Sequence, residues 1–124
     1  MARKKILVVD DDPGILVMLH LMLRLEGYEA IVCEDALSVI EMMTREAPDL
    51  VLLDAMMPHL DGIQVLDLIR AQGLPNSPPV LLFTGNADDN YIQKAMQAGA
   101  SGLLAKPFVK EELLERLHAF LGTG

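Results

Sequence analysis

The chain has 124 residues, of which 52% are hydrophobic and 23% are charged, and its formal net charge at pH 7 is −8. This length and composition predict one globular domain with a substantial core. No apolar run approaches the roughly 18 residues of a membrane span. The negative charge argues against direct nucleic-acid binding, because phosphate backbones attract basic surfaces. The single cysteine, Cys33, excludes an internal disulfide and is typical of a reducing cytoplasm.

Short apolar runs alternate with segments of helical periodicity along the chain. Asp12 and Pro13 suit the N-cap and first position of the first helix. Glu29 interrupts the second apolar run, which predicts an edge strand. Met96 is expected on the buried side of the fourth helix. The predicted strands are 5–9, 28–33, 50–53, 80–83 and 102–105, and the predicted helices run from 13 to near 27 and over 35–45, 61–71, 88–98 and 110–121.

This strict alternation predicts an α/β fold. Five strand–helix units form a single doubly wound (βα)5 domain, with a mainly parallel sheet covered by helices on both faces. Right-handed crossovers restrict the topology to a few arrangements. Residues 1–124 are expected to form this one domain, with 121–124 as a frayed tail or the start of a removed linker.

Polar residues follow several of the predicted strands. Asp10 and Asp11 follow the first strand, Asp54 the third, Thr84 the fourth and Lys106 the fifth. Taken alone, Asp54 is equally consistent with a residue that ends a strand or caps a turn. In a parallel sheet, however, all these strand ends share one edge. Crowded carboxylates repel one another unless a cation joins them, and Mg2+ accepts such oxygen ligands. With a hydroxyl and an ammonium group nearby, Asp54 as nucleophile predicts an aspartyl phosphate.

Over nearly all of its length, the sequence resembles the receiver domain of two-component response regulators. Five short motifs occur in the family's order and spacing, and their combination is specific although each alone is weak. The resemblance implies a flavodoxin-like, five-stranded parallel sheet of order 2-1-3-4-5, as in the chemotaxis regulator. The motifs are Ile6–Pro13, Leu53–Gly62, Phe83–Gly85, Gly99–Gly102 and Lys106–Phe108.

The resemblance also implies how the site binds its ion and receives its phosphoryl group. Asp54 is the implied phosphoacceptor, and the donor is the phosphohistidine of a sensor histidine kinase or phosphotransfer protein. Asp10, Asp11, Asp54 and the backbone carbonyl of Met56 are the implied ligands of Mg2+. Asp12 lies outside this set and is expected to cap the first helix.

Further residues are implied to contact the phosphoryl group. Thr84 and Lys106 bind its oxygens, helped by the backbone amides of Met56 and Gly85. The Lys106–Pro107 peptide bond is implied to be cis. Two neighbours are assigned lesser roles: His59 is expected to be an exposed loop residue, and Asn86 is expected at the mouth of the pocket.

In this family, phosphorylation changes the face formed by the fourth helix, fifth strand and fifth helix. The implied protein is a cytoplasmic regulatory domain rather than an enzyme, because it catalyses only its own phosphorylation and slow dephosphorylation. Its implied target is a downstream protein or a removed output domain. The sequence departs from the family at Leu103, where a switch aromatic is usual. Tyr91 is either a substitute for that ring or a packing residue.

Two alternative functions are kept. A phosphorylation-independent pseudo-receiver would only bind partners, and Leu103 is the feature that favours it. A phosphatase of the haloacid-dehalogenase type would use Asp10 as nucleophile in an Asp-x-Asp motif, but this leaves Asp54 without a role. The complete set of residues after the strands favours the phospho-accepting receiver.

Overall fold

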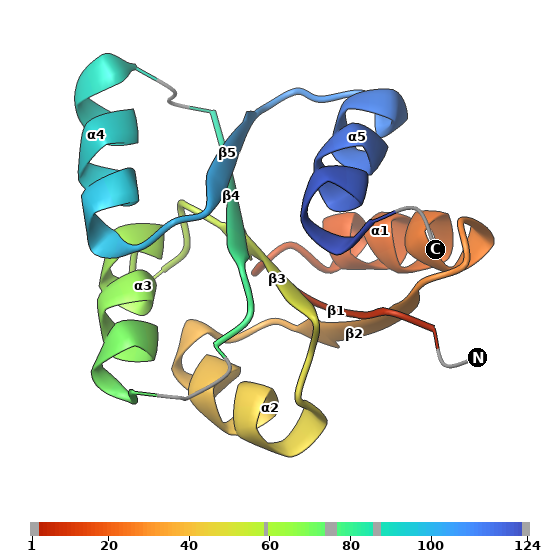
Figure 1. Cartoon of the computed structure of the whole chain (residues 1–124), viewed down its shortest axis with the longest axis horizontal. Coiled ribbons are helices and arrows are strands. Elements are labelled where there is room, and N and C mark those ends of the chain that lie inside the picture. The colour runs from red at the N-terminus through yellow and green to blue at the C-terminus, as the bar shows by residue number, and fades with distance from the viewer. Residues whose placement is uncertain (1–2, 59, 74–76, 86–87, 123–124) are drawn as a thin grey trace.

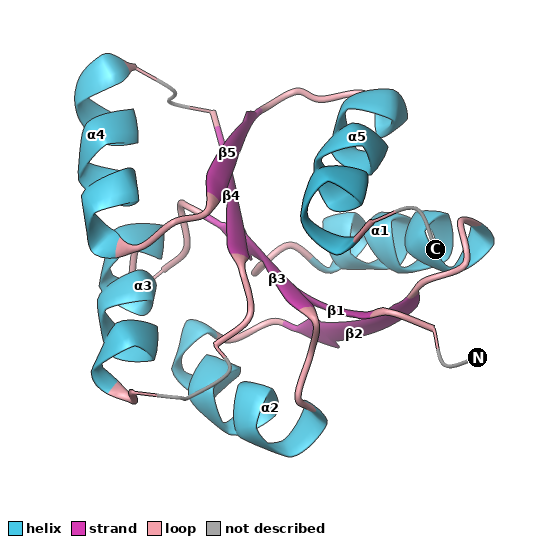
Figure 2. Ribbon diagram, viewed as in Figure 1, coloured by secondary structure: helices cyan, strands magenta, loops and turns pink. Residues whose placement is uncertain are grey.

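The computed structural model describes residues 3–58, 60–73, 77–85 and 88–122. His59, Asn86 and the last two residues of the predicted tail therefore lie outside the described residues. Strands and helices alternate through this part of the chain (Figures 1 and 2). They are β1 (Lys5–Val9), α1 (Pro13–Leu25), β2 (Glu29–Cys33), η1 (Ala36–Ser38), α2 (Val39–Glu46), β3 (Leu50–Asp54), α3 (Gly62–Ala71), β4 (Val80–Thr84), α4 (Asp89–Ala98), β5 (Gly102–Ala105) and α5 (Lys110–Leu121).

The five strands form one sheet in the order β2-β1-β3-β4-β5, and each neighbouring pair is parallel. In Figure 1, α1 and α5 cover one face of the sheet, whereas α2, α3 and α4 cover the other. The predicted doubly wound fold and its strand order are confirmed. The edge position predicted for the second strand is also confirmed, since β2 pairs only with β1 among the described strands.

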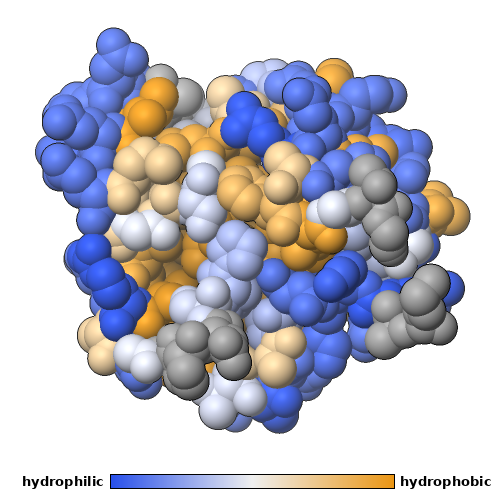
Figure 3. All heavy atoms as spheres, in the orientation of Figure 1, coloured by the Kyte–Doolittle hydropathy of each residue, from blue (hydrophilic) through white to orange (hydrophobic). Residues whose placement is uncertain are grey.

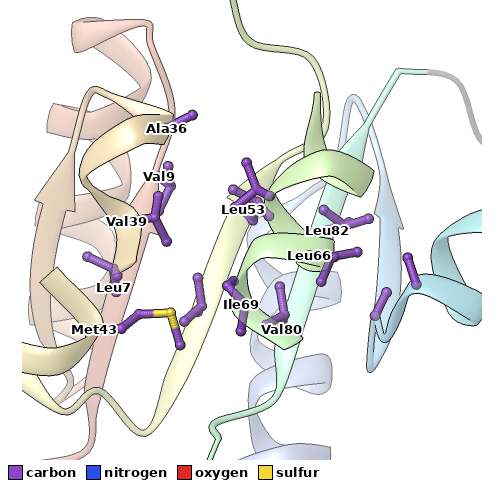
Figure 4. Close-up of a cluster of buried hydrophobic side chains, with 14 of the residues drawn as sticks. Leu7, Val9, Ala36, Val39, Met43, Leu53, Leu66, Ile69, Val80 and Leu82 are labelled. Carbon is purple, nitrogen blue, oxygen red and sulfur yellow. The ribbon is translucent and has the colours of Figure 1, made fainter. Parts of the chain in front are cut away.

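Side chains from alternate strand positions build two hydrophobic clusters, one on each face of the sheet. In β1, Leu7 and Val9 belong to the cluster beneath α2, α3 and α4 (Figure 4), whereas Ile6 and Val8 belong to the cluster beneath α1 and α5. Successive side chains of a strand point to opposite faces. Because both faces are covered, the inner strands are apolar at consecutive positions, as buried parallel strands require.

Two of the expectations need correction. Met96 is 47% exposed and not buried, because the buried stripe of α4 runs through Ala95 and Ala98. The segment expected to be helical from Asp35 begins with the 3₁₀ turn η1, and α2 starts only at Val39. None of the helices that the structure describes combines the length and apolarity needed to cross a bilayer.

Polar caps begin the helices that follow β1 and β3. The Asp12 carboxylate accepts a hydrogen bond from the Gly14 N–H at 2.9 Å, and Pro13 occupies the first turn of α1. Asp61 and Gln64 form a reciprocal capping box at the start of α3. Such caps satisfy N–H groups that have no partner within the helix. They anchor the polar ends of two inner strands at the same edge of the sheet.

Candidate functional site

Three carboxylates meet at the carboxyl edge of the sheet. Asp54 is the last residue of β3, and Asp10 and Asp11 directly follow β1. One carboxylate oxygen from each lies within 4.8 Å of the other two. Asp10 and Asp54 are only 1% and 3% exposed, whereas Asp11 is exposed. Two buried carboxylates side by side are costly unless protons or cations neutralise them.

Asp10 has an oxygen that lacks a partner. Its Oδ1 accepts a hydrogen bond from the Asp12 N–H at 2.9 Å, but its Oδ2 is buried and unpaired among the described residues. Burial, and secondarily the negative charge of Asp54, raises the pKa of Asp10 to about 6, although the Asp12 amide and Lys106 oppose the shift. A buried carboxylate that has an unpaired oxygen and lies in a cluster with two further carboxylates fits a hard divalent cation such as Mg2+.

The Asp54 carboxylate is held by two donors. Its Oδ1 accepts hydrogen bonds from the Met56 N–H and from the Lys106 ammonium, each at 3.1 Å. Close packing constrains the loop after Asp54, because the Gly62 N–H donates to the Ala55 carbonyl at 2.8 Å. A Cβ on Gly62 would lie 2.9 Å from the Ala55 Cα, so only glycine fits there without displacement. The position of the Met56 amide therefore depends on the start of α3.

Lys106 reaches Asp54 from the end of β5. Its backbone N–H donates to the Thr84 carbonyl at 2.7 Å, and the Lys106–Pro107 peptide bond is cis. Its ammonium lies 4.9 Å from the centre of the Phe83 ring, within cation–π range. Phe83 in turn packs edge to face against Phe108, with 6.1 Å between ring centres. Backbone and ring contacts thus direct the ammonium toward the carboxylates.

Thr84 is the last residue of β4, the strand between β3 and β5, and Gly85 follows it. The register pairs Asp54 with Phe83, so Thr84 lies one position further toward the site, and it is 1% exposed. Gly85 follows on the exposed side of the strand end. Leu103 pairs with Leu82 and is partly buried against the cluster under α2, α3 and α4, which Tyr91 also contacts. Leu103, the residue at which the sequence departs from the family, is thus part of the core beside the site.

The structure brings together Asp10, Asp11, Asp54 and Lys106, which the sequence predicted to meet. It adds two features that the sequence reasoning missed. One is the contact of Phe83 with Lys106. Its only signal in the sequence was that side chains alternate between the two faces of a strand, which fixes the face of β4 to which Phe83 points. The other is an apolar cavity of about 320 Å³ beside the ammonium. Its lining residues are Ile15, Met18, Phe83, Lys106, Pro107 and Phe108.

Comparisons with known proteins agree with this geometry. Residues 6–118 match the response regulator receiver domain family. The chain is 37% identical over 119 residues to the DNA-binding response regulator MtrA of Mycolicibacterium smegmatis, covering 96% of this chain and 51% of MtrA. It is 38% identical over 117 residues to the response regulator MprA of Mycobacterium leprae, covering 94% of this chain and 50% of MprA. The chain thus spans about half the length of these relatives.

Solved structures show the same similarity. The chemotaxis protein CheY4 of Vibrio cholerae matches with a TM-score of 0.90 and 30% identity, covering 97% of this chain and 100% of CheY4. The BeF3-activated receiver domain of Klebsiella pneumoniae RstA matches with a TM-score of 0.85 and 31% identity, covering 94% of this chain and 97% of that domain. The chain belongs to the response regulator receiver domain family of two-component systems.

Proposed function

We propose that this protein is a phospho-accepting switch in which Asp54 receives a phosphoryl group in an Mg2+-dependent reaction. The observation that carries this proposal is that one ammonium group and two further carboxylates surround the buried carboxylate of Asp54. The Lys106 ammonium lies 3.1 Å from Asp54 Oδ1, and oxygens of Asp10 and Asp11 lie within 4.8 Å of an Asp54 oxygen. A nucleophile beside a cation site is the arrangement that phosphoryl transfer requires.

Different residues of the site have different roles in the phosphoryl transfer. Asp10, Asp11, Asp54 and the Met56 carbonyl would hold Mg2+, which supplies positive charge to offset that of the transferring phosphoryl group. An Asp54 oxygen attacks phosphorus, the P–N bond to the donor histidine breaks, and the imidazole leaves with the bonding electron pair. Lys106 neutralises charge on the phosphoryl oxygens.

Hydrogen-bond donors then hold the product. The Thr84 hydroxyl and the backbone amides of Met56 and Gly85 would donate to the phosphoryl oxygens. The Met56 amide already donates to the Asp54 carboxylate in the structure described. Met56, two positions after Asp54, is 66% exposed, and its thioether sulfur is only a weak acceptor for a hydrolytic water. This supports slow autodephosphorylation.

The geometry favours Asp54 over Asp10 as nucleophile. Burial raises the pKa of Asp10 to about 6, so this carboxyl holds a proton more tightly than an ordinary aspartate, and its Oδ2 is the unpaired oxygen suited to a cation. Asp54 instead has a positive charge and a backbone amide directed at it. These contacts argue against the phosphatase alternative. The same intact contacts argue against a pseudo-receiver.

The phosphodonor is proposed to be a sensor histidine kinase or phosphotransfer protein that contacts α1. Val17, Met18, Leu21 and Leu25 on this helix are 51–87% exposed, which is unusual for large apolar side chains so close together. Met18 also lines the cavity beside Lys106. An apolar helix face on the donor would cover these residues and bring its histidine to Asp54.

Output is proposed to pass through the face formed by α4, β5 and α5. Figure 3 shows apolar side chains gathered between the hydrophilic outer surfaces of α4 and α5. Met96 on α4 and Phe120 on α5 are 47% and 36% exposed. Such exposed apolar residues are suited to a downstream protein or an output domain, and phosphorylation would change their arrangement.

Intact-mass measurement tests this function. Wild type, Asp54→Asn and Asp10→Asn would be incubated with acetyl phosphate, with and without Mg2+. We expect a hydroxylamine-labile phosphoryl adduct only on wild type and only with Mg2+. No adduct on wild type despite Mg2+ binding would support the pseudo-receiver. An adduct that persists in Asp54→Asn but is lost in Asp10→Asn would support the phosphatase.

A further inference from the structure

Tyr91 carries a buried hydroxyl that has no hydrogen-bond partner among the described residues. The other buried side-chain atom of this kind in the described part of the chain is Asp10 Oδ2, which belongs to the cation site. Tyr91 lies in the first turn of α4, where its backbone N–H donates to the N-cap Asp88 at 2.8 Å. An unsatisfied buried hydroxyl is destabilising, so a hydrogen bond from this hydroxyl to a newly arrived acceptor would lower the free energy of the protein.

The surroundings of Tyr91 connect it to the phosphorylation site. Its side chain packs against the cluster beneath α2, α3 and α4, to which Leu103 also contributes. Burial, and then the charges of Asp61 and Asp54, raise the pKa of Tyr91 above its ordinary value. The phenol therefore remains a neutral O–H donor, and one of the two carboxylates that act on it is Asp54, the proposed phosphoacceptor.

We propose that Tyr91 couples phosphorylation of Asp54 to α4, through a hydrogen bond from its hydroxyl to the phosphoryl group. This inference rests on the proposed function of Asp54. A phosphoryl group adds negative charge and strong acceptor oxygens at the carboxylate. The unpaired O–H of Tyr91 then gains a partner, and the first turn of α4 moves with the ring.

Leu103 cannot perform this task, because its side chain has no polar atom and no ring. Tyr91 is on α4, the helix that follows β4 and Thr84 in the chain, whereas Leu103 is on β5. The output face described above includes α4, so a movement of its first turn changes that face directly. The Tyr91 hydroxyl thus binds the phosphoryl group, and the first turn of α4 moves in response.

The composition of the chain makes this proposal directly measurable. The protein has two tyrosines and no tryptophan, so a [ζ-13C]tyrosine-labelled sample gives two phenol resonances that report hydrogen bonding. Tyr28 is the internal control, because it is 7% exposed and packs in the opposite cluster beneath α1 and α5. Tyr91→Phe and Tyr28→Phe assign the two signals. With Mg2+ and beryllofluoride, we expect the Tyr91 signal to shift and the Tyr28 signal to stay.

A binding measurement gives the contribution of the Tyr91 hydroxyl to beryllofluoride affinity. Tyr91→Phe keeps the ring and every charged group of the site, so any loss reports on the hydroxyl alone. We expect its beryllofluoride affinity, at saturating Mg2+, to be roughly tenfold weaker than that of wild type, as expected for one lost hydrogen bond to a charged acceptor. Backbone amide shifts of α4 on activation should shrink in parallel. Tyr28→Phe should match wild type in both measurements.

The outcomes separate this inference from the proposed function. A wild-type protein that forms no phosphoryl adduct in the mass measurement overturns both. An adduct accompanied by an unmoved Tyr91 resonance overturns the role of Tyr91 alone. That role is likewise overturned if Tyr91→Phe binds beryllofluoride as tightly as wild type and its α4 amides respond fully.

Discussion

The ammonium of Lys106 lies 3.1 Å from Asp54 Oδ1, although 52 positions separate the two residues in the chain. The lysine follows β5 and the aspartate ends β3, so this contact crosses the end of β4, where Thr84 lies. The Asp54 side chain is 4% exposed, whereas that of Lys106 remains 34% exposed. The lysine thus neutralises a buried carboxylate while its own side chain remains partly accessible to solvent.

Removing this ammonium should destabilise the metal-free protein. Lys106→Ala leaves the buried Asp54 carboxylate beside Asp10 without its cation, and we expect the free energy of unfolding to fall by about 1–2 kcal/mol. Urea denaturation with and without Mg2+ measures this, and the loss should shrink when Mg2+ supplies positive charge. The control is Lys110→Ala, which breaks a solvent-exposed pair with Glu26 and should have a smaller effect. Equal losses in the two variants would refute the special role of Lys106.

Stability without Mg2+ should depend on pH through Asp10. Burial raises the pKa of Asp10 from 3.8 to about 6, so the folded protein holds this proton more tightly than the unfolded chain. The contribution of Asp10 to stability is therefore complete below pH 3.8 and is lost as the pH rises to about 6.

The variant Asp10→Asn tests this dependence. At neutral pH it should raise the free energy of unfolding of the metal-free protein by an amount on the order of 2 kcal/mol. It should also flatten the decrease in stability across the acidic range, measured by urea denaturation with a chelator. Asp67→Asn, which alters an exposed carboxylate on α3, should keep the wild-type slope. A wild-type slope in Asp10→Asn would contradict the prediction.

The close approach at Gly62 should not tolerate a side chain. A Cβ there would meet both the Ala55 Cα and the Leu82 Cδ2 at 2.9 Å, so Gly62→Ala forces backbone movement. We expect a loss of about 1–3 kcal/mol, typical of overpacking, and slower phosphorylation by acetyl phosphate because the Met56 loop shifts. The matched control is Gly14→Ala in α1, whose Cβ would meet only the Asp12 carboxylate at 3.3 Å. Its stability should equal or exceed that of wild type, and melting temperatures report both.

A charge on the exposed face of α1 should block the donor protein without affecting the chemistry. Leu21 is 57% exposed, so Leu21→Glu should fold normally and accept phosphoryl from acetyl phosphate at the wild-type rate. Transfer from the histidine kinase that phosphorylates wild type fastest should slow roughly tenfold, because binding would bury the new carboxylate. Leu37→Glu, with 67% exposure near α2, is the control and should transfer normally. Equal slowing in both variants would exclude α1 as the docking face.

Much of this molecule follows from local sequence patterns. The alternation of apolar runs and helical segments predicted the doubly wound fold, because strand and helix periodicities are properties of short windows. Polar residues after the strands predicted which side chains meet, because parallel strands bring their carboxyl ends to one edge. The proximity of Asp10, Asp11, Asp54 and Lys106 follows from these two rules, whereas the roles of these residues remain predictions.

Other features depend on packing between distant segments. Met96 was expected to be buried, yet the rotation of α4 against the sheet turns Ala95 and Ala98 inward instead. The unpaired Asp10 Oδ2 and the unpaired hydroxyl of Tyr91 are equally invisible in the sequence. Whether a polar atom finds a partner depends on neighbours that the fold brings from elsewhere in the chain.

The sequence by itself therefore determined the order of the elements, the edge of the sheet at which the polar residues gather and the types of those residues. Tertiary structure alone decided which of those polar atoms are buried, which are paired and which have no partner among the described residues. The physical reason is that periodicity is a local property, whereas desolvation and hydrogen bonding depend on long-range contacts such as that between Lys106 and Asp54.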